Sequence, residues 1–149
     1  IAKARPHIEN AAIRNRGTLG GALAHADPAS DMPAILLALD ASIAIRSGRG
    51  ERVVGIDGFF QGAFATDLAE DEILTEIRLP ATPSGAGMAY CSIEQPASGY
   101  SMVVVAAVVG RAGGSISSAR VAITRWIGGG RCSSRYAMPP WMSGVSTSW

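Results

Sequence analysis

A glycine-rich segment near the start of the chain is the feature that most limits how this sequence can fold. Gly17, Gly20 and Gly21 lie within five residues, with Thr18 between them. Glycine has no Cβ atom, so successive backbone N–H groups in such a turn can approach a pyrophosphate group, and Thr18 adds a hydroxyl donor. Two-glycine turns also occur in loops that bind nothing, and this spacing is neither GxGxxG nor a P-loop. These residues alone therefore leave both interpretations open.

A carboxylate follows the glycine-rich segment and precedes an apolar run. Asp31 lies ten positions after Gly21, and residues 35–39 (ILLAL) are apolar. The run predicts a buried helix of about three turns, with Pro28 or Pro33 suited to a first helical turn. A carboxylate at a helix N-terminus can accept hydrogen bonds from the sugar hydroxyls of a nucleotide cofactor, or it can cap the helix. Taken alone, capping is the favoured interpretation of Asp31.

Short strands follow this helix. Residues 42–46 and 51–54, on either side of a glycine-containing turn at 48–50, predict a β-hairpin. The sequence then brings together all three phenylalanines of the chain, which predicts an aromatic anchor on the core. Residues 72–80 alternate with a period of two, so that Leu74, Glu76 and Arg78 share one face. The opposite face would carry Ile73, Thr75, Ile77 and Leu79.

A second unit is predicted after residues 80–87, which are rich in Pro, Gly, Ser and Ala and indicate a linker. Residues 87–93 predict a strand, and residues 102–109 and 115–124 predict a hairpin around a turn at 112–114, with Ala119, Val121 and Ile123 on one face. Residues 125–149 lack periodicity and carry no acidic side chain, which predicts a poorly structured tail. A hydrophobic docking tail is the alternative.

Composition excludes several classes of function. The chain has 149 residues, is 48% hydrophobic and carries a formal net charge of +1, so it offers a core but no charge excess for nucleic acid or a membrane surface. The longest apolar run, 102–109, is far short of the roughly 20 residues of a membrane-spanning helix, and no secretion signal is present. We therefore expect a soluble, cytoplasmic protein that binds neither nucleic acid nor the bilayer interior, and an incomplete chain, because it begins with Ile1.

Few side chains suggest catalysis. Cys91 and Cys132 lack metal-ligand spacing and are expected to be free thiols. His7 and His25 each stand without an orienting carboxylate, which favours structural roles, and no catalytic triad or metal cluster can be assembled. The arginines at positions 14 and 16 are equally compatible with contacts to phosphate or a partner and with solvent exposure.

Two long stretches carry a family resemblance. Residues 13–21 (IRNRGTLGG) and 24–34 (AHADPASDMPA) together resemble the second flavin-binding motif of the medium subunits of the xanthine dehydrogenase and carbon monoxide dehydrogenase family. The resemblance continues through residues 71–80 (DEILTEIRLP) and from 97–100 into 105–109. It covers residues 1 to about 124.

The resemblance implies an α+β fold and an FAD site. Residues 1–80 would form the later lobe of a PCMH-type FAD-binding domain whose N-terminal lobe is missing, and residues 87–124 the start of a small antiparallel-sheet C-terminal flavoprotein domain. Asp31 would bind flavin hydroxyls and Leu74 would lie near the flavin. The pyrophosphate and ribityl portion would be lined by Thr18, Leu19, Gly20, Gly21 and Ala22.

The same resemblance implies an oxidoreductase subunit without catalytic residues or metal ligands of its own. Electrons would pass from iron–sulfur clusters through FAD to an external acceptor, after substrate hydroxylation at a molybdenum cofactor. The implied partners are an iron–sulfur small subunit and a molybdopterin-binding large subunit. The chain departs from the family in lacking the earlier glycine-rich loop, in having Ala22 where relatives often have a polar residue, and in lacking a basic residue near Cys91 and Ser92. The alternative is a truncated, non-enzymatic fragment that does not bind FAD on its own. A nucleic-acid-binding module is disfavoured by the near-neutral charge.

Overall fold

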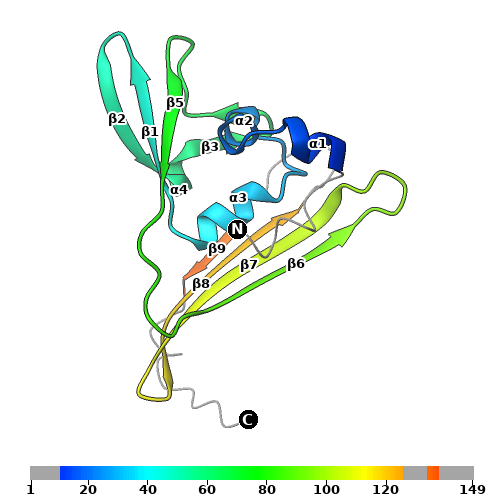
Figure 1. The fold of residues 1–149 in the computed structure, drawn as a ribbon, viewed down its shortest axis with the longest axis vertical. Coiled ribbons are helices and arrows are strands. Elements are labelled where there is room, and N and C mark those ends of the chain that lie inside the picture. The colour runs from blue at the N-terminus through cyan, green and yellow to red at the C-terminus, as the bar shows by residue number, and fades with distance from the viewer. Residues whose placement is uncertain (1–10, 126–133, 138–149) are drawn as a thin grey trace.

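The computed structural model describes residues 11–125 and 134–137, which form a mixture of short helices and antiparallel sheets (Figure 1). Predictions for His7, Cys132 and the tryptophans lie outside these residues. The helices are α1 (Ala11–Arg16), α2 (Leu19–His25), α3 (Met32–Ala38) and α4 (Ile56–Phe59). The strands are β1 (Ser42–Ser47), β2 (Gly50–Gly55), β3 (Phe60–Gly62), β4 (Ala65–Thr66), β5 (Ile73–Arg78), β6 (Gly87–Glu94), β7 (Ser101–Ala112), β8 (Ser115–Arg125) and β9 (Ser134–Ala137).

The first sheet has the strand order β2-β1-β5, and all of its pairs are antiparallel. The β1–β2 hairpin is confirmed, with Ser47 opposite Gly50 across the turn. Gly50 has a φ of +135°, a conformation that L side chains rarely adopt, so glycine is required where the second strand begins. Strands β3 and β4 form a separate two-stranded pair.

The predicted period of two in β5 is wrong at one position. Ala44 pairs with Glu76 and Ile45 pairs with Leu74, so Thr75 is the extra residue of a β-bulge. The Thr75 hydroxyl donates a hydrogen bond to the Ala44 carbonyl oxygen at 3.2 Å. The bulge turns Leu74 to the same face as Ile77, whereas Ile73 is 69% exposed. Alternation along one strand cannot predict this change, because it arises from the pairing with β1.

The second sheet has the strand order β6-β7-β8-β9 and is also antiparallel. The predicted strand and long hairpin are confirmed, and the hairpin turns at Gly113 and Gly114, whose φ values are +58° and +82°. Two successive positive φ angles define a tight hairpin turn that glycine adopts without strain. Strand β9 lies within the predicted unstructured tail, so that prediction fails for residues 134–137, where pairing with β8 orders the backbone. The rest of the tail lies outside the described residues.

Helix α3 lies over one face of the second sheet, and α2 packs on the side of α3 that faces away from this sheet (Figure 1). All seven of its residues are buried. It is two turns long rather than three, because Leu39 forms the C-cap and Asp40 adopts a left-handed φ of +57°. The buried apolar side chains of both sheets join one cluster around α3, which includes Leu36, Ile43, Ile45, Ile56, Phe59, Val104, Ala106 and Ala122. Residues 79–86 connect the sheets without regular structure, and the division into two domains at this point stays a prediction.

The aromatic anchor is smaller than predicted. Phe59 is fully buried and contacts Phe60 edge to face, with ring centroids 5.2 Å apart. Phe64 lies in the turn between β3 and β4, where it has a left-handed φ of +54°. It is 61% exposed, and its ring lies against His25.

Candidate functional site

The glycine pair of the resemblance motif begins a helix and does not form a turn. Thr18 is the N-cap of α2, and its Oγ1 accepts a hydrogen bond from the Gly21 N–H at 3.0 Å. The Ala22 N–H donates to the Thr18 carbonyl oxygen, also at 3.0 Å. The Ala22 N–H is therefore already used by the helix. By their position in the first turn, the N–H groups of Leu19 and Gly20 have no intrahelical acceptor.

A side chain at Gly21 would force a shift in this cap. A Cβ atom at Gly21 would lie 2.9 Å from the Thr18 Oγ1 atom, a distance that real Cβ contacts do not reach. A Cβ atom at Gly20 would meet the Leu74 Cδ2 atom at 3.7 Å, an ordinary contact. The β5 bulge thus brings Leu74 against the first turn of α2, and the structure places these two predicted site residues together.

Asp31 occupies the N-cap position of α3 but makes no capping hydrogen bond, so the capping interpretation is wrong. Its backbone is already in the helical region, at φ −75° and ψ −28°. The residue is only 3% exposed, and its Oδ1 atom has no hydrogen-bond partner among the described residues. Burial raises the pKa of the Asp31 carboxyl, and the nearby hydroxyls of Ser101 and Tyr90 offset part of that rise. Asp31 is therefore a buried acid that the fold leaves incompletely satisfied.

Two residues near Asp31 were not predicted from the sequence. Tyr90 lies on β6 opposite Ala106 of β7, and Ser101 begins β7 and is 6% exposed. Burial, with a smaller contribution from the Asp31 charge, raises the pKa of Tyr90 to about 12, so its phenol is protonated at neutral pH. Both residues follow the predicted linker, and no spacing pattern ties them to Asp31. The only available signal was a tyrosine within the predicted strand at residues 87–93.

The predicted site residues fall on two neighbouring helices and on strand β5. Residues 18–22 form the start of α2, on the side of the first sheet, while Asp31 begins α3 beside β6 and β7. Helix α2 contacts α3 on one side and β5, the strand that carries Leu74, on another. The fold therefore brings Leu74 to the glycine pair and brings Asp31 to the second sheet.

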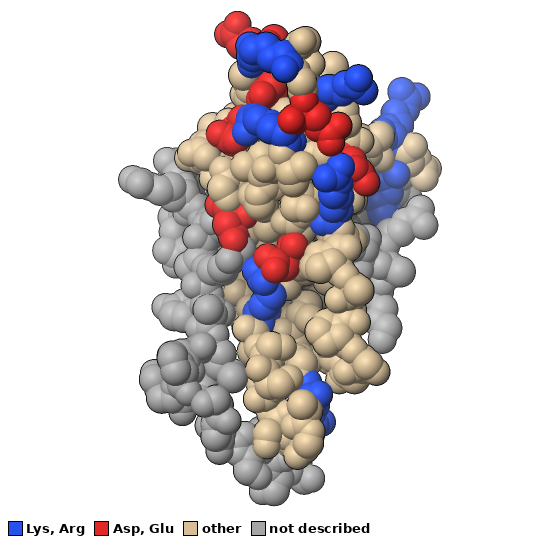
Figure 2. Space-filling view, turned by 90° about the vertical axis from the view of Figure 1, so that its left-hand side faces the viewer, with Lys and Arg blue, Asp and Glu red and all other residues tan. Residues whose placement is uncertain are grey.

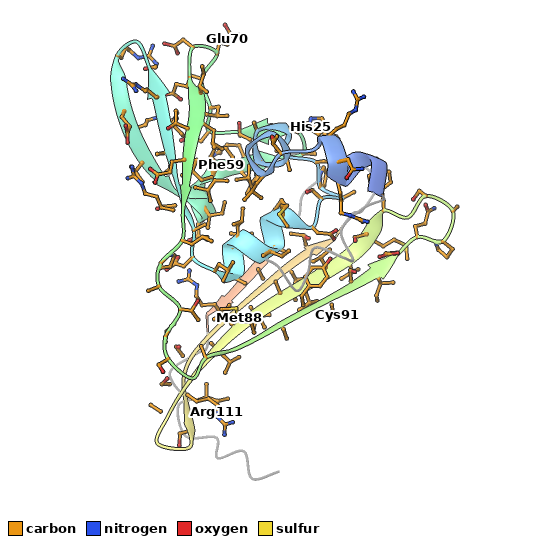
Figure 3. The ribbon with its side chains drawn as sticks, viewed as in Figure 1. His25, Phe59, Glu70, Met88, Cys91 and Arg111 are labelled. Carbon is orange, nitrogen blue, oxygen red and sulfur yellow. The ribbon has the colours of Figure 1, made fainter. Side chains whose placement is uncertain are left out.

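The remaining candidate residues show ordinary surroundings. The exposed His25 ring lies 5.1 Å from the Phe64 ring, which is consistent with a structural role, and Cys91 is a free, exposed thiol on β6 (Figure 3). Arg14 and Arg16 lie in α1. Within residues 11–125 and 134–137, no three His, Cys, Asp or Glu side chains group as metal ligands, and no helix is long and apolar enough to cross a membrane.

Comparison with known proteins identifies the family. Residues 1–82 match the profile described as "FAD binding domain in molybdopterin dehydrogenase". This chain belongs to that family. FAD is the family's cofactor, and the unpartnered polar atom of Asp31 fits a ligand rich in hydroxyl groups.

Relatives of this FAD-binding family are subunits of dehydrogenases and hydroxylases. The nicotine 6-hydroxylase medium subunit of Paenarthrobacter nicotinovorans is 41% identical over 128 residues, which cover 86% of this chain and 44% of that protein. The carbon monoxide dehydrogenase medium chain of Hydrogenophaga pseudoflava is 37% identical over 124 residues, or 83% of this chain and 43% of that one. The chain thus spans less than half the length of these relatives.

Solved structures of the family share the fold. Carbon monoxide dehydrogenase from Hydrogenophaga pseudoflava, in a form that lacks the Mo-pyranopterin moiety of the molybdenum cofactor, superposes with a TM-score of 0.85 and 33% identity. The match covers 99% of this chain and 50% of that one. Quinoline 2-oxidoreductase from Pseudomonas putida 86 superposes with a TM-score of 0.80 and 29% identity, covering 98% of this chain and 50% of that one.

Proposed function

We propose that this chain forms part of the FAD-binding subunit of a molybdenum hydroxylase and holds the pyrophosphate and sugar portions of the cofactor. The observation that carries the proposal is the buried, unpartnered Asp31 Oδ1 atom, ten residues after the glycine pair in a chain of this family. A carboxylate oxygen that stays buried without a partner is costly, so it calls for a ligand that donates a hydrogen bond. The hydroxyls of the FAD sugar portions supply such donors.

Each predicted residue has a task in this proposal. The N–H groups of Leu19 and Gly20 lack intrahelical acceptors and would donate to the pyrophosphate, with the dipole of α2 adding a small favourable charge. Thr18 and Gly21 would hold the start of α2 in shape through the cap, and Ala22 would line the same surface. Asp31 would accept from sugar hydroxyls, and Leu74 would offer an apolar contact to the flavin.

The wider role is that of an electron-transfer subunit. Bound FAD would supply the redox chemistry, by which electrons from iron–sulfur clusters would reach an external acceptor. The protein's part is to hold the cofactor and to dock an iron–sulfur small subunit and a molybdopterin-binding large subunit. Relatives named as a medium chain and a medium subunit support this arrangement. We also propose that residues 1–80 are the later lobe of the FAD-binding domain and residues 87–124 the start of the C-terminal flavoprotein domain.

Titration of the chain with FAD, followed by flavin fluorescence polarisation, tests the proposal. We expect saturable binding by the wild-type chain and its loss in Gly21→Val, where the new side chain collides with Thr18 and obstructs the approach to the first turn of α2. Gly55→Val is the matched control, because Gly55 has an extended backbone at φ −67° and ψ 145° and open space around its Cβ position.

Two results would contradict the proposal. Equal binding by Gly21→Val and the wild type would remove the start of α2 from the site. No binding by the wild-type chain would favour the alternative function, a fragment that does not hold FAD on its own. Circular dichroism of each variant shows whether the fold is retained.

A further inference from the structure

Two buried polar atoms in the same neighbourhood have no hydrogen-bond partner in the part of the chain that the structure describes. They are the Asp31 Oδ1 atom and the Tyr90 hydroxyl. The two side chains lie close together and their contact contributes to the pKa of each, but it does not reach full hydrogen-bonding geometry at either of these atoms. Unsatisfied buried polar atoms are uncommon in folded proteins, and each one calls for an explanation.

The two atoms offer complementary hydrogen-bonding capacity. Ionised Asp31 is an acceptor only, whereas the phenol of Tyr90 keeps its proton at neutral pH and can donate. A sugar hydroxyl both donates and accepts, so one such group placed between them satisfies both atoms. The Ser101 hydroxyl, buried beside the carboxylate, adds a second polar group at the same place.

We propose that Tyr90 and Asp31 together bind one hydroxyl group of the sugar portions of FAD, with Tyr90 donating to it and Asp31 accepting from it. This inference rests on the proposed function and extends it. The family profile ends at residue 82, whereas Tyr90 belongs to β6 of the second sheet. The second sheet therefore contributes directly to the cofactor site and is more than a support for α3.

The test uses Tyr90→Phe in the whole chain, because this change removes the hydroxyl and keeps the ring. We expect FAD to bind about tenfold more weakly, the size of one lost hydrogen bond. Tyr100→Phe is the matched control, since Tyr100 is 45% exposed in the loop before β7, and its FAD affinity should equal that of the wild type. Thermal unfolding of the unliganded variants separates a loss of affinity from a loss of fold.

Partial ligands identify the hydroxyl. If it belongs to the ribityl chain, Tyr90→Phe weakens riboflavin and leaves ADP-ribose unaffected; if it belongs to the ribose, the reverse holds. FAD analogues that each lack one hydroxyl complete a double-mutant cycle. For the correct analogue, Tyr90→Phe causes no further loss of affinity, because the contact is already absent.

Other results would overturn the inference. Unchanged FAD affinity in Tyr90→Phe would remove Tyr90 from the site while leaving the proposed function intact. Equal weakening of every ligand, including lumiflavin, which has no sugar hydroxyls, together with a lower Tm would show a purely structural role. Failure of the wild-type chain to bind FAD would overturn both proposals, and the titration of the wild type distinguishes that case from the others.

Discussion

Two acidic clusters of this chain differ in how their charges are satisfied. At the first sheet, Arg52 lies between Asp67 and Glu72 and forms an ion pair of 2.6 Å with each carboxylate. The Glu72 carboxylate also accepts a hydrogen bond from the Ala69 N–H at 3.0 Å. The Arg52 contacts, followed by the Ala69 hydrogen bond, lower the pKa of Glu72 to about 2. Figure 2 shows that charged side chains gather over this part of the molecule and are sparse toward its other end.

The cluster around Asp31 is the opposite case. Asp31 is 3% exposed, its neighbours are hydroxyl groups and the like charge of Glu94, and one of its oxygen atoms has no partner among the described residues. The first cluster is complete within the fold, so its role is structural. The second is left open by the fold, which supports the proposed role of Asp31 in holding FAD. Whether a carboxylate is fully paired within the fold distinguishes Asp31 from Asp67 and Glu72 more clearly than the spacing of these residues in the sequence does.

The largest expected effect tests whether the two clusters belong to one folding unit. Leu36 is fully buried in α3, within the core that both sheets share. Leu36→Ala should lower the free energy of unfolding by about 2–5 kcal/mol. Amide hydrogen exchange should then show that Ile43 in β1 and Ala106 in β7 lose protection together.

Leu79→Ala is the control for this truncation, because Leu79 is 45% exposed and its change should stay within about 0.5 kcal/mol. Loss of protection in the first sheet alone would show that the sheets unfold independently. That result would support the division into two domains at residues 80–87.

A second prediction concerns pH, because the two clusters should respond with opposite signs. Glu72 has a folded pKa of about 2 against an ordinary value of 4.5, so its stabilisation is present above pH 4.5 and is lost as the pH falls toward 2. Asp31 has a raised pKa against an ordinary value of 3.8. Its contribution is therefore fully present below pH 3.8 and is lost as the pH rises through the folded pKa.

Urea unfolding of two isosteric variants measures this difference. Glu72→Gln should be less stable than the wild type at neutral pH, and the difference should vanish near pH 2. Asp31→Asn should match the wild type most closely below pH 3.8 and become the more stable of the two as the pH rises, in the absence of FAD. Parallel pH profiles for the two variants would refute the contrast between the clusters.

The hairpins were predictable from the sequence because their signals are local. Alternation along the strands and the glycines at the turns predicted both, and the positive φ angles of Gly113 and Gly114 explain why glycine is needed in the second turn. The start of α2 was misread as a turn because glycine has a low helix propensity. Thr18 three residues before Gly21 was the available capping signal, and a Cβ atom at Gly21 would lie only 2.9 Å from the Thr18 Oγ1 atom of that cap.

The features that the sequence did not reveal depend on contacts between distant segments. The bulge at Thr75 arises from pairing with β1, and it alone turns Leu74 toward Gly20. Tyr90 and Asp31 lie nearly sixty residues apart, and packing of α3 on the second sheet brings them together. The resemblance motif could therefore identify the family and the cofactor, whereas this part of the candidate site required the fold.

The smallest effects concern the ion pairs of the first sheet. Arg49→Met removes a pair with Asp71 whose side chains are 68% and 51% exposed, so it should change stability by about 0–1 kcal/mol. Arg52→Met should cost more, because it leaves both Asp67 and the largely buried Glu72 side chain without their cation. Carboxyl NMR titration gives a sharper comparison, since Arg52→Met should return the Glu72 pKa toward 4.5, while Arg49→Met should leave it close to 2. An equal response to the two substitutions would mean that general surface charge, and not the Arg52 contacts, lowers the pKa of Glu72. The conclusion that the fold itself satisfies the charges of the first cluster would then be wrong.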